Sequence, residues 1–74
     1  MKTLALVGFT FVDAFCWLAT EARAEGCAIM VSHTHKRAWL RDEQYFIVKD
    51  ESEIGKLGIK VDQIITRQSM EGAA

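Results

Sequence analysis

The sequence predicts an α/β fold: a small, mostly parallel sheet of about four strands with one long helix and one or two short ones. Short apolar runs alternate with segments of helical pattern in the order β-α-β-α-β-β, which is typical of α/β sandwiches. The chain has 74 residues, no proline and an apolar fraction of 50%. It is therefore expected to be one small globular domain over residues 1–74 rather than a disordered chain.

The first half of the chain predicts a strand, a helix and a second strand. Residues 3–7 are a continuous apolar run that ends at Gly8. An amphipathic helix is expected over residues 10–25, because apolar residues recur there with helical period and Gly26 stands where helices often end. Residues 27–32 are a second apolar run, suited to a strand that is buried on both faces. Since a helix joins the two strands, they are expected to pair in parallel through a right-handed crossover.

The second half of the chain predicts shorter elements. Residues 34–44 are largely polar and are expected to form a short helix with a threonine cap. Residues 45–49 are aromatic and β-branched, which favours a strand. A one-turn helix is expected within residues 50–58 and a fourth strand at residues 60–66, and residues 67–74 are expected to be a flexible tail. One long helix covers one face of a sheet at most, so a sheet face or a strand edge should meet a partner.

The beginning of the chain also has features of a secretory signal peptide. Lys2 precedes an apolar stretch, and residues 22–24 have the small-x-small form of a cleavage site. Asp13 opposes this interpretation, because a carboxylate in an apolar signal core is unfavourable by roughly 2.5–3.5 kcal/mol. Cleavage after Ala24 would also leave about 50 residues with one cysteine, and a domain of that size usually needs disulfides. The sequence therefore favours a cytoplasmic protein, with a secreted peptide as the alternative.

The turn after the first predicted strand has the position and length of a phosphate-binding loop. Gly8 is followed by four residues and then by Asp-Ala-Phe at residues 13–15, where such a loop has Gly-Lys-Ser/Thr. With residues 28–32 as second strand and residues 57–65 leading to the last one, the layout resembles a degenerate, truncated core of the phosphate-binding-loop (P-loop) NTPases and helicase-like proteins. Thr66 stands where their magnesium-binding carboxylate would be. The resemblance implies that both nucleotide-handling motifs are lost, and therefore a binding protein without ATPase activity.

Two histidines follow the second predicted strand. His33 and His35 could begin a metal site or provide general acid–base catalysis. A third ligand is needed, for which Asp13 and Cys27 are the candidates, and no nucleophile with a recognisable partner accompanies the histidines. A solvated polar loop is the favoured interpretation, so no cofactor, metal ion or catalytic residue is expected.

Contact with a partner is expected through residues of two segments. The candidates are Trp17, Asp13, Glu21, Trp39, Arg37 and Arg41. Helical phase directs one set of side chains of the long helix inward: Phe11, Phe15, Leu18 and Ala22. The same phase directs Trp17 away from this face, where it is expected either to be exposed, as tryptophan at binding hot spots is, or to pack under a loop or the C-terminal tail. The other three candidates lie on the predicted short helix.

These observations predict a non-catalytic binding protein that acts through protein–protein contact, with a partner or with a second copy of itself. An accessory or inhibitory factor of phage or mobile-element type would fit. The net charge of −1 provides no basic field for nucleic acid or an anionic membrane, and no nucleotide partner is expected. The alternative is a small ligand-binding, metal-binding or enzymatic α/β domain that uses residues 8–13 with His33 and His35.

Overall fold

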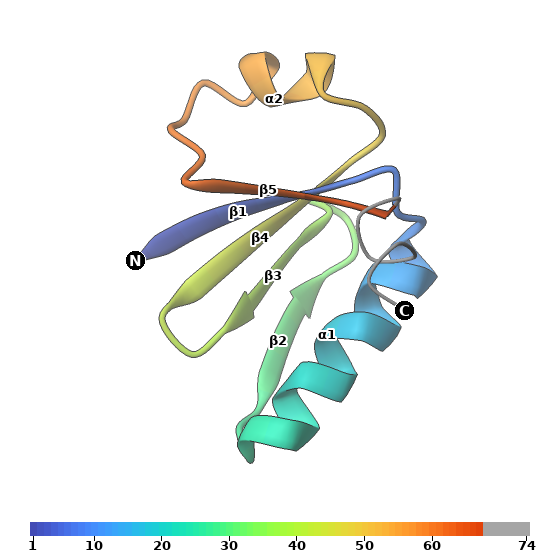
Figure 1. The fold of residues 1–74 in the computed structure, drawn as a ribbon, viewed down its shortest axis with the longest axis vertical. Coiled ribbons are helices and arrows are strands. Elements are labelled where there is room, and N and C mark those ends of the chain that lie inside the picture. Colours follow the sequence, from blue (N-terminus) through green and yellow to red (C-terminus); the bar gives the residue numbers. More distant parts are fainter. Residues whose placement is uncertain (68–74) are drawn as a thin grey trace.

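The computed structural model describes residues 1–67. They form a five-stranded mixed sheet with one helix of 15 residues and one of five (Figure 1). In chain order the elements are β1 (Lys2–Val7), α1 (Phe11–Glu25), β2 (Ile29–Ser32), β3 (Arg37–Leu40), β4 (Glu43–Val48), α2 (Ser52–Lys56) and β5 (Gln63–Thr66). Of the predicted tail at residues 67–74, residues 68–74 lie outside the described part of the chain.

The prediction of a mostly parallel sheet of about four strands is wrong. The sheet has five strands in the order β2-β3-β4-β1-β5. β1 pairs in parallel with β4 and β5, whereas β3 pairs antiparallel with β2 and with β4. β2 therefore lies at the edge and does not pair with β1. α1 carries the chain past β4 and β3 to that edge, and the antiparallel strands β2, β3 and β4 then lead back to the centre.

The error originates in residues 34–44, which were expected to be a helix. They contain β3 and the start of β4, joined by a tight turn in which Arg41 has a φ of 55°. Ala38 and Leu40 are buried and alternate with half-buried neighbours, which is the period of a strand. Hydrogen bonding to a strand on each side outweighs the polar local composition, because strand formation depends on neighbours more than on intrinsic propensity.

The prediction of the long helix is confirmed, including both of its ends. The Thr10 hydroxyl accepts a hydrogen bond from the Asp13 N–H at 3.1 Å, and Gly26 ends the helix with a left-handed φ of 68°. The predicted inward face is partly wrong. Ala14 and Leu18 are buried at its centre, whereas Phe15 is 41% exposed. Small side chains at the centre of the face allow α1 to lie close to the sheet.

The two helices lie on opposite faces of the sheet. Leu4 and Leu6 of β1 belong to the core under α1, and the alternate residues Ala5 and Val7 belong to a smaller core that α2 covers. In Figure 1, α2 lies near β5 and far from β2 and β3. The part of this second face that β2 and β3 form is therefore not covered by a helix in the described part of the chain.

Tyr45 is a residue of the main core whose pKa is strongly shifted in the fold. It is buried, and its hydroxyl donates a hydrogen bond to the Glu43 carboxylate at 3.0 Å. Burial first, and this hydrogen bond second, raise the pKa of Tyr45 well above its ordinary range. Tyr45 therefore stays neutral in the fold and fixes the start of β4 under α1.

Neither helix of residues 1–67 has the length and apolar character that a bilayer span requires.

Candidate binding surface

The part of the sheet formed by β2 and β3, together with the adjoining strand β4, carries a cluster of aromatic, apolar and cationic side chains, of which Phe46 on β4 also packs against the smaller core under α2. We call it the open sheet face and define it by Met30, Arg37, Trp39, Gln44 and Phe46. Cross-strand register brings these residues together: Met30 lies opposite Trp39, Trp39 opposite Gln44, and Arg37 opposite Phe46. All of them point away from the α1 side, because Ala38 and Tyr45, which alternate with them, are buried in the core under α1.

Arg37 is at the centre of the open sheet face. Its guanidinium carbon lies 5.0 Å from the centroid of the Trp39 ring and 4.6 Å from that of the Phe46 ring. Its Nη2 donates a hydrogen bond to Gln44 Oε1 at 2.7 Å, and Gln44 Nε2 in turn donates to the Thr3 hydroxyl at 2.9 Å. A cation placed over aromatic rings gains about 0.5–2 kcal/mol per contact, depending on its exposure to water. The cluster is therefore rigid before any partner arrives.

One nitrogen atom of this cluster lacks a hydrogen-bond partner within the described residues. Arg37 Nε is buried and has no hydrogen-bond partner among residues 1–67. A buried donor without a partner is unfavourable by about 1–3 kcal/mol. The aromatic packing around Arg37 is thus kept at the expense of one hydrogen bond.

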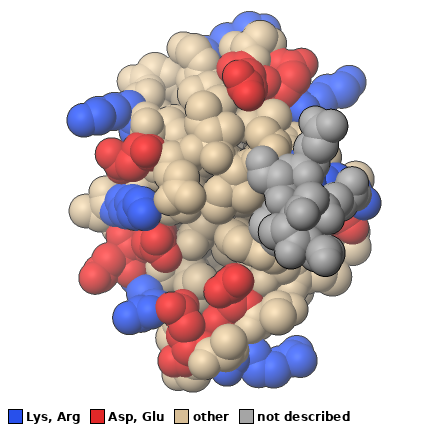
Figure 2. Space-filling model, in the orientation of Figure 1, with Lys and Arg blue, Asp and Glu red and all other residues tan. Residues whose placement is uncertain are grey.

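Met30 is the side chain of the open sheet face that is most exposed to solvent. It is 68% exposed and lies opposite the half-buried Trp39 on the neighbouring strand. A large apolar side chain beside aromatic rings on a sheet is typical of a contact surface. Elsewhere the surface is mixed, and Figure 2 shows acidic and basic side chains interspersed in that view without a field of one sign.

The structure brings together two of the six predicted contact residues, Arg37 and Trp39. Their place differs from the prediction, since they lie on a strand and not on a helix. Arg41, expected beside them, lies in the turn after β3 and forms an ion pair with Glu25 at the end of α1. Arg41 is therefore not part of the open sheet face.

The other three predicted contact residues lie along one flank of α1, and Trp17 is not directed outward. Trp17 is half-buried and packs edge-to-face on Tyr45, with ring centroids 6.2 Å apart. Asp13 is ion-paired with Arg67, which follows β5. Glu21 is half-buried, and its charge contributes to the raised pKa of Tyr45. This flank holds α1 against the sheet, so the prediction of an outward-facing tryptophan is wrong.

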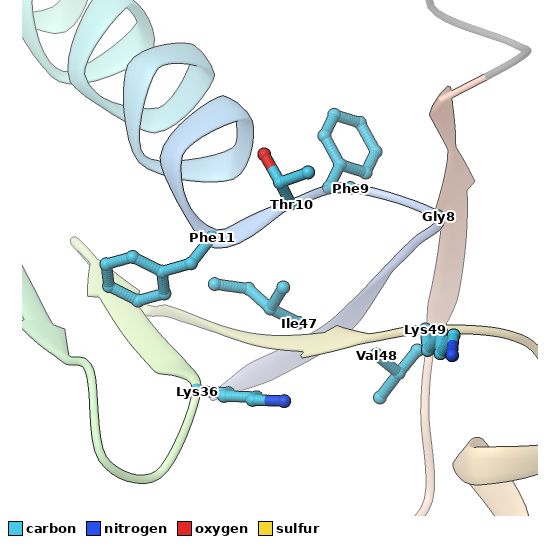
Figure 3. A pocket seen from close by; sticks show the side chains of 8 residues that line it. All are labelled: Gly8, Phe9, Thr10, Phe11, Lys36, Ile47, Val48 and Lys49. Carbon is cyan, nitrogen blue, oxygen red and sulfur yellow. The ribbon is translucent and has the colours of Figure 1, made fainter.

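A pocket of about 360 Å³ lies at the first turn, where β1 and β4 end side by side. Its lining residues are Gly8, Phe9, Thr10, Phe11, Lys36, Ile47, Val48 and Lys49. Figure 3 shows the turn on one side of this first-turn pocket and the two lysine side chains on the other. Asp13 is not among the lining residues, and the two lysines make the pocket suited to an anion.

The two histidines are close to this region but do not form a common site. The His33 ring packs on Phe11 with centroids 4.3 Å apart, and His35 Nδ1 lies 2.8 Å from the Ser32 hydroxyl. Within the described residues, no three side chains of the types His, Cys, Asp and Glu are grouped so that they could hold a metal ion.

Comparisons with protein-family models, with curated proteins and with solved structures find no match to this chain. The resemblance to P-loop NTPases therefore stays a prediction.

Met30, Gln44 and Phe46 were missed as contact residues. Met30 was expected inside a strand buried on both faces, whereas β2 is an edge strand. The available signal was the number of helices, since one long helix leaves part of a sheet uncovered. That signal predicts an open face but not which residues form it, because the strand order was unknown.

Proposed function

We propose that this chain is a non-catalytic binding protein whose open sheet face contacts another protein. The observation that carries the proposal is the Arg37 guanidinium lying over the Trp39 and Phe46 rings, with the exposed Met30 opposite Trp39 on the neighbouring strand. Tryptophan and arginine dominate binding hot spots, and methionine is enriched at interfaces. A prearranged cluster also loses little side-chain entropy when a partner binds.

The composition of this face supports a protein partner over nucleic acid. Arg37 is the one charged residue among the five that define the face, and its guanidinium lies over two rings of the same chain. A nucleic-acid surface needs several cations that neutralise phosphates and free rings on which bases stack.

The core supports a protein that keeps its first 24 residues and acts in the cytoplasm. β1 lies between β4 and β5, and Leu6 of β1 and Leu18 of α1 are completely buried. Cleavage after Ala24 would remove both elements and leave the remaining strands without most of their core. For a small binding protein of this kind we propose an accessory or inhibitory role, of the type found in phages and mobile elements.

Trp39→Ala is the variant that tests this function. The wild-type protein is expected to capture a protein partner from the cells that produce it, and the variant is expected to bind that partner at least 30-fold more weakly, because a hot-spot truncation is unfavourable by about 2 kcal/mol or more. Affinity is measured with the purified partner by calorimetry. Ile59→Ala truncates an exposed apolar side chain that does not belong to the open sheet face and should leave the affinity unchanged.

Two results would contradict the proposal. One is wild-type affinity in a Trp39→Ala protein that melts at the wild-type temperature. The other is an equal loss of affinity in the Ile59→Ala control. If Trp39→Ala does not fold, Trp39→Leu retains an apolar side chain beside Arg37 and serves in its place.

A second candidate function is the binding of a small anion in the first-turn pocket, as in the alternative based on residues 8–13. The two lysines of the pocket favour it, whereas His33 and His35 are not lining residues.

If the first-turn pocket binds an anion, phosphate or a nucleotide is expected to raise the Tm of the wild type by a few degrees. The Lys36→Ala/Lys49→Ala variant should lose this increase and Lys60→Ala should keep it. An unchanged wild-type Tm across phosphate, nucleotides and divalent metals would exclude this function.

A further inference from the structure

β2 is an edge strand without protection against further strand pairing. Residues 26–35 contain no Lys, Arg, Asp or Glu, and the chain has no proline. Within residues 1–67, the backbone of β2 makes no hydrogen bond to any element besides β3. Natural sheets usually protect their edges with charges, proline or bulges, because an open edge pairs with another strand. β2 has only four residues, and it carries neither charge nor proline that would hinder pairing with another strand.

Exposed apolar side chains border this edge on both faces of the sheet. On the α2 side, Met30 is 68% exposed. On the other side α1 packs against β2, and the Phe11 ring touches His33 in the turn after β2. Phe15 lies one helical turn after Phe11 on the same flank of α1 and is 41% exposed. The edge thus has an apolar border on each face.

We propose that β2 pairs antiparallel with β2 of a second copy, which joins the two sheets into one of ten strands. With the two-fold axis at Met30, this residue lies opposite its counterpart, and Ile29 lies opposite Val31 of the other copy. The two Phe15 side chains then approach each other on the α1 side. This pairing goes beyond the proposed function: it takes up the strand edge and Met30 at the border of the open sheet face, and it leaves Arg37, Trp39, Gln44 and Phe46 accessible to another protein.

A second copy fits this edge because a two-fold interface places the same patch against itself. Any net charge along the strand would then repel its own copy, and β2 has no charge at all. The antiparallel arrangement also brings Glu25, at the end before β2, toward the turn with His35 and Lys36 of the other copy. The other edge strand is less suitable, since Asp62 and Arg67 flank β5 directly.

The test is the mass of the purified full-length protein in solution, measured by sedimentation equilibrium. The wild type is expected to have the mass of two chains, and Met30→Lys that of one chain, because two lysines opposite each other across a strand pair repel. Ile64→Lys places the same charge on β5, where Ile64 is 45% exposed, and should retain the dimer. A wild-type monomer up to millimolar concentration would overturn the proposal, as would a dimer that Ile64→Lys breaks and Met30→Lys retains.

A second measurement does not depend on the folding of a variant. In a sample that mixes isotope-labelled and unlabelled wild-type chains, filtered NMR spectra should show contacts between copies from Met30 and Phe15. Contacts between copies that arise only at β5, or none at all, would overturn the proposal. Because both measurements use the purified chain alone, their outcome is separate from whether the open sheet face binds another protein.

Discussion

Leu18→Ala is expected to lower the free energy of unfolding by about 2–5 kcal/mol, the range for deletion of a buried leucine side chain. Leu18 is completely buried at the centre of α1, where it belongs to the same core as Leu6 and Tyr45. A domain of this size is stabilised by only about 5 kcal/mol or somewhat more. The variant should therefore lose a large part of the stability of the domain, and its urea midpoint, followed by circular dichroism, should decrease strongly.

The matched control for Leu18→Ala is Val12→Ala on the same helix. Val12 is 68% exposed, so its truncation removes aliphatic carbon that is already in contact with water. The control should change the free energy of unfolding by no more than about 0.5 kcal/mol. Similar destabilisation by both substitutions would mean that α1 does not pack with Leu18 at the centre of its buried face.

Asp62→Ala is expected to lower the free energy of unfolding by about 1–3 kcal/mol, because it leaves a buried backbone donor without a partner. The Asp62 carboxylate accepts a hydrogen bond from the Thr3 N–H at 2.9 Å, and the Asp62 N–H donates to the Thr3 carbonyl at 2.8 Å. Thr3 is buried. These two bonds fasten the connection between α2 and β5 to the start of β1, just before the two strands pair.

Hydrogen exchange distinguishes this local effect from a general loss of stability. In Asp62→Ala, the amides of Thr3 and of β5 should exchange faster relative to those of β3, because the bonds that hold β5 are lost first. Asp62→Asn retains an acceptor oxygen and should lose less than half as much stability. If Asp62→Asn is as destabilised as Asp62→Ala, the charge of Asp62 matters and the hydrogen bond to Thr3 does not explain its effect.

Elements with local end signals were predicted correctly. α1 begins after Thr10 and ends at Gly26, because a hydroxyl cap and a left-handed glycine act within one turn of the helix. The short helix beginning at Ser52 was predicted for a similar reason, from its turn residues. The strands β1 and β4 were also predicted, because a short, continuous apolar run is typical of a strand that is buried in a sheet.

The candidate site was predicted in part. Arg37 and Trp39 were proposed as contact residues from their chemistry, but on a helix, where side chains two positions apart point in nearly opposite directions. On β3 they share one face, and their neighbours Met30 and Phe46 come from strands that lie seven or more positions away in sequence. Only strand pairing brings these four side chains together.

The amino-acid sequence by itself determined where the long helix begins and ends, that the apolar runs at residues 3–7 and 45–49 contribute strands, and that part of the sheet would lack a covering helix. The tertiary structure decided the order of the strands, the identity of the edge and which side of α1 faces inward. Helix caps and apolar runs act between near neighbours in the chain, whereas pairing and packing depend on distant residues. For this reason Trp17, expected outside, packs on Tyr45, and Met30, expected inside, stands exposed at the edge.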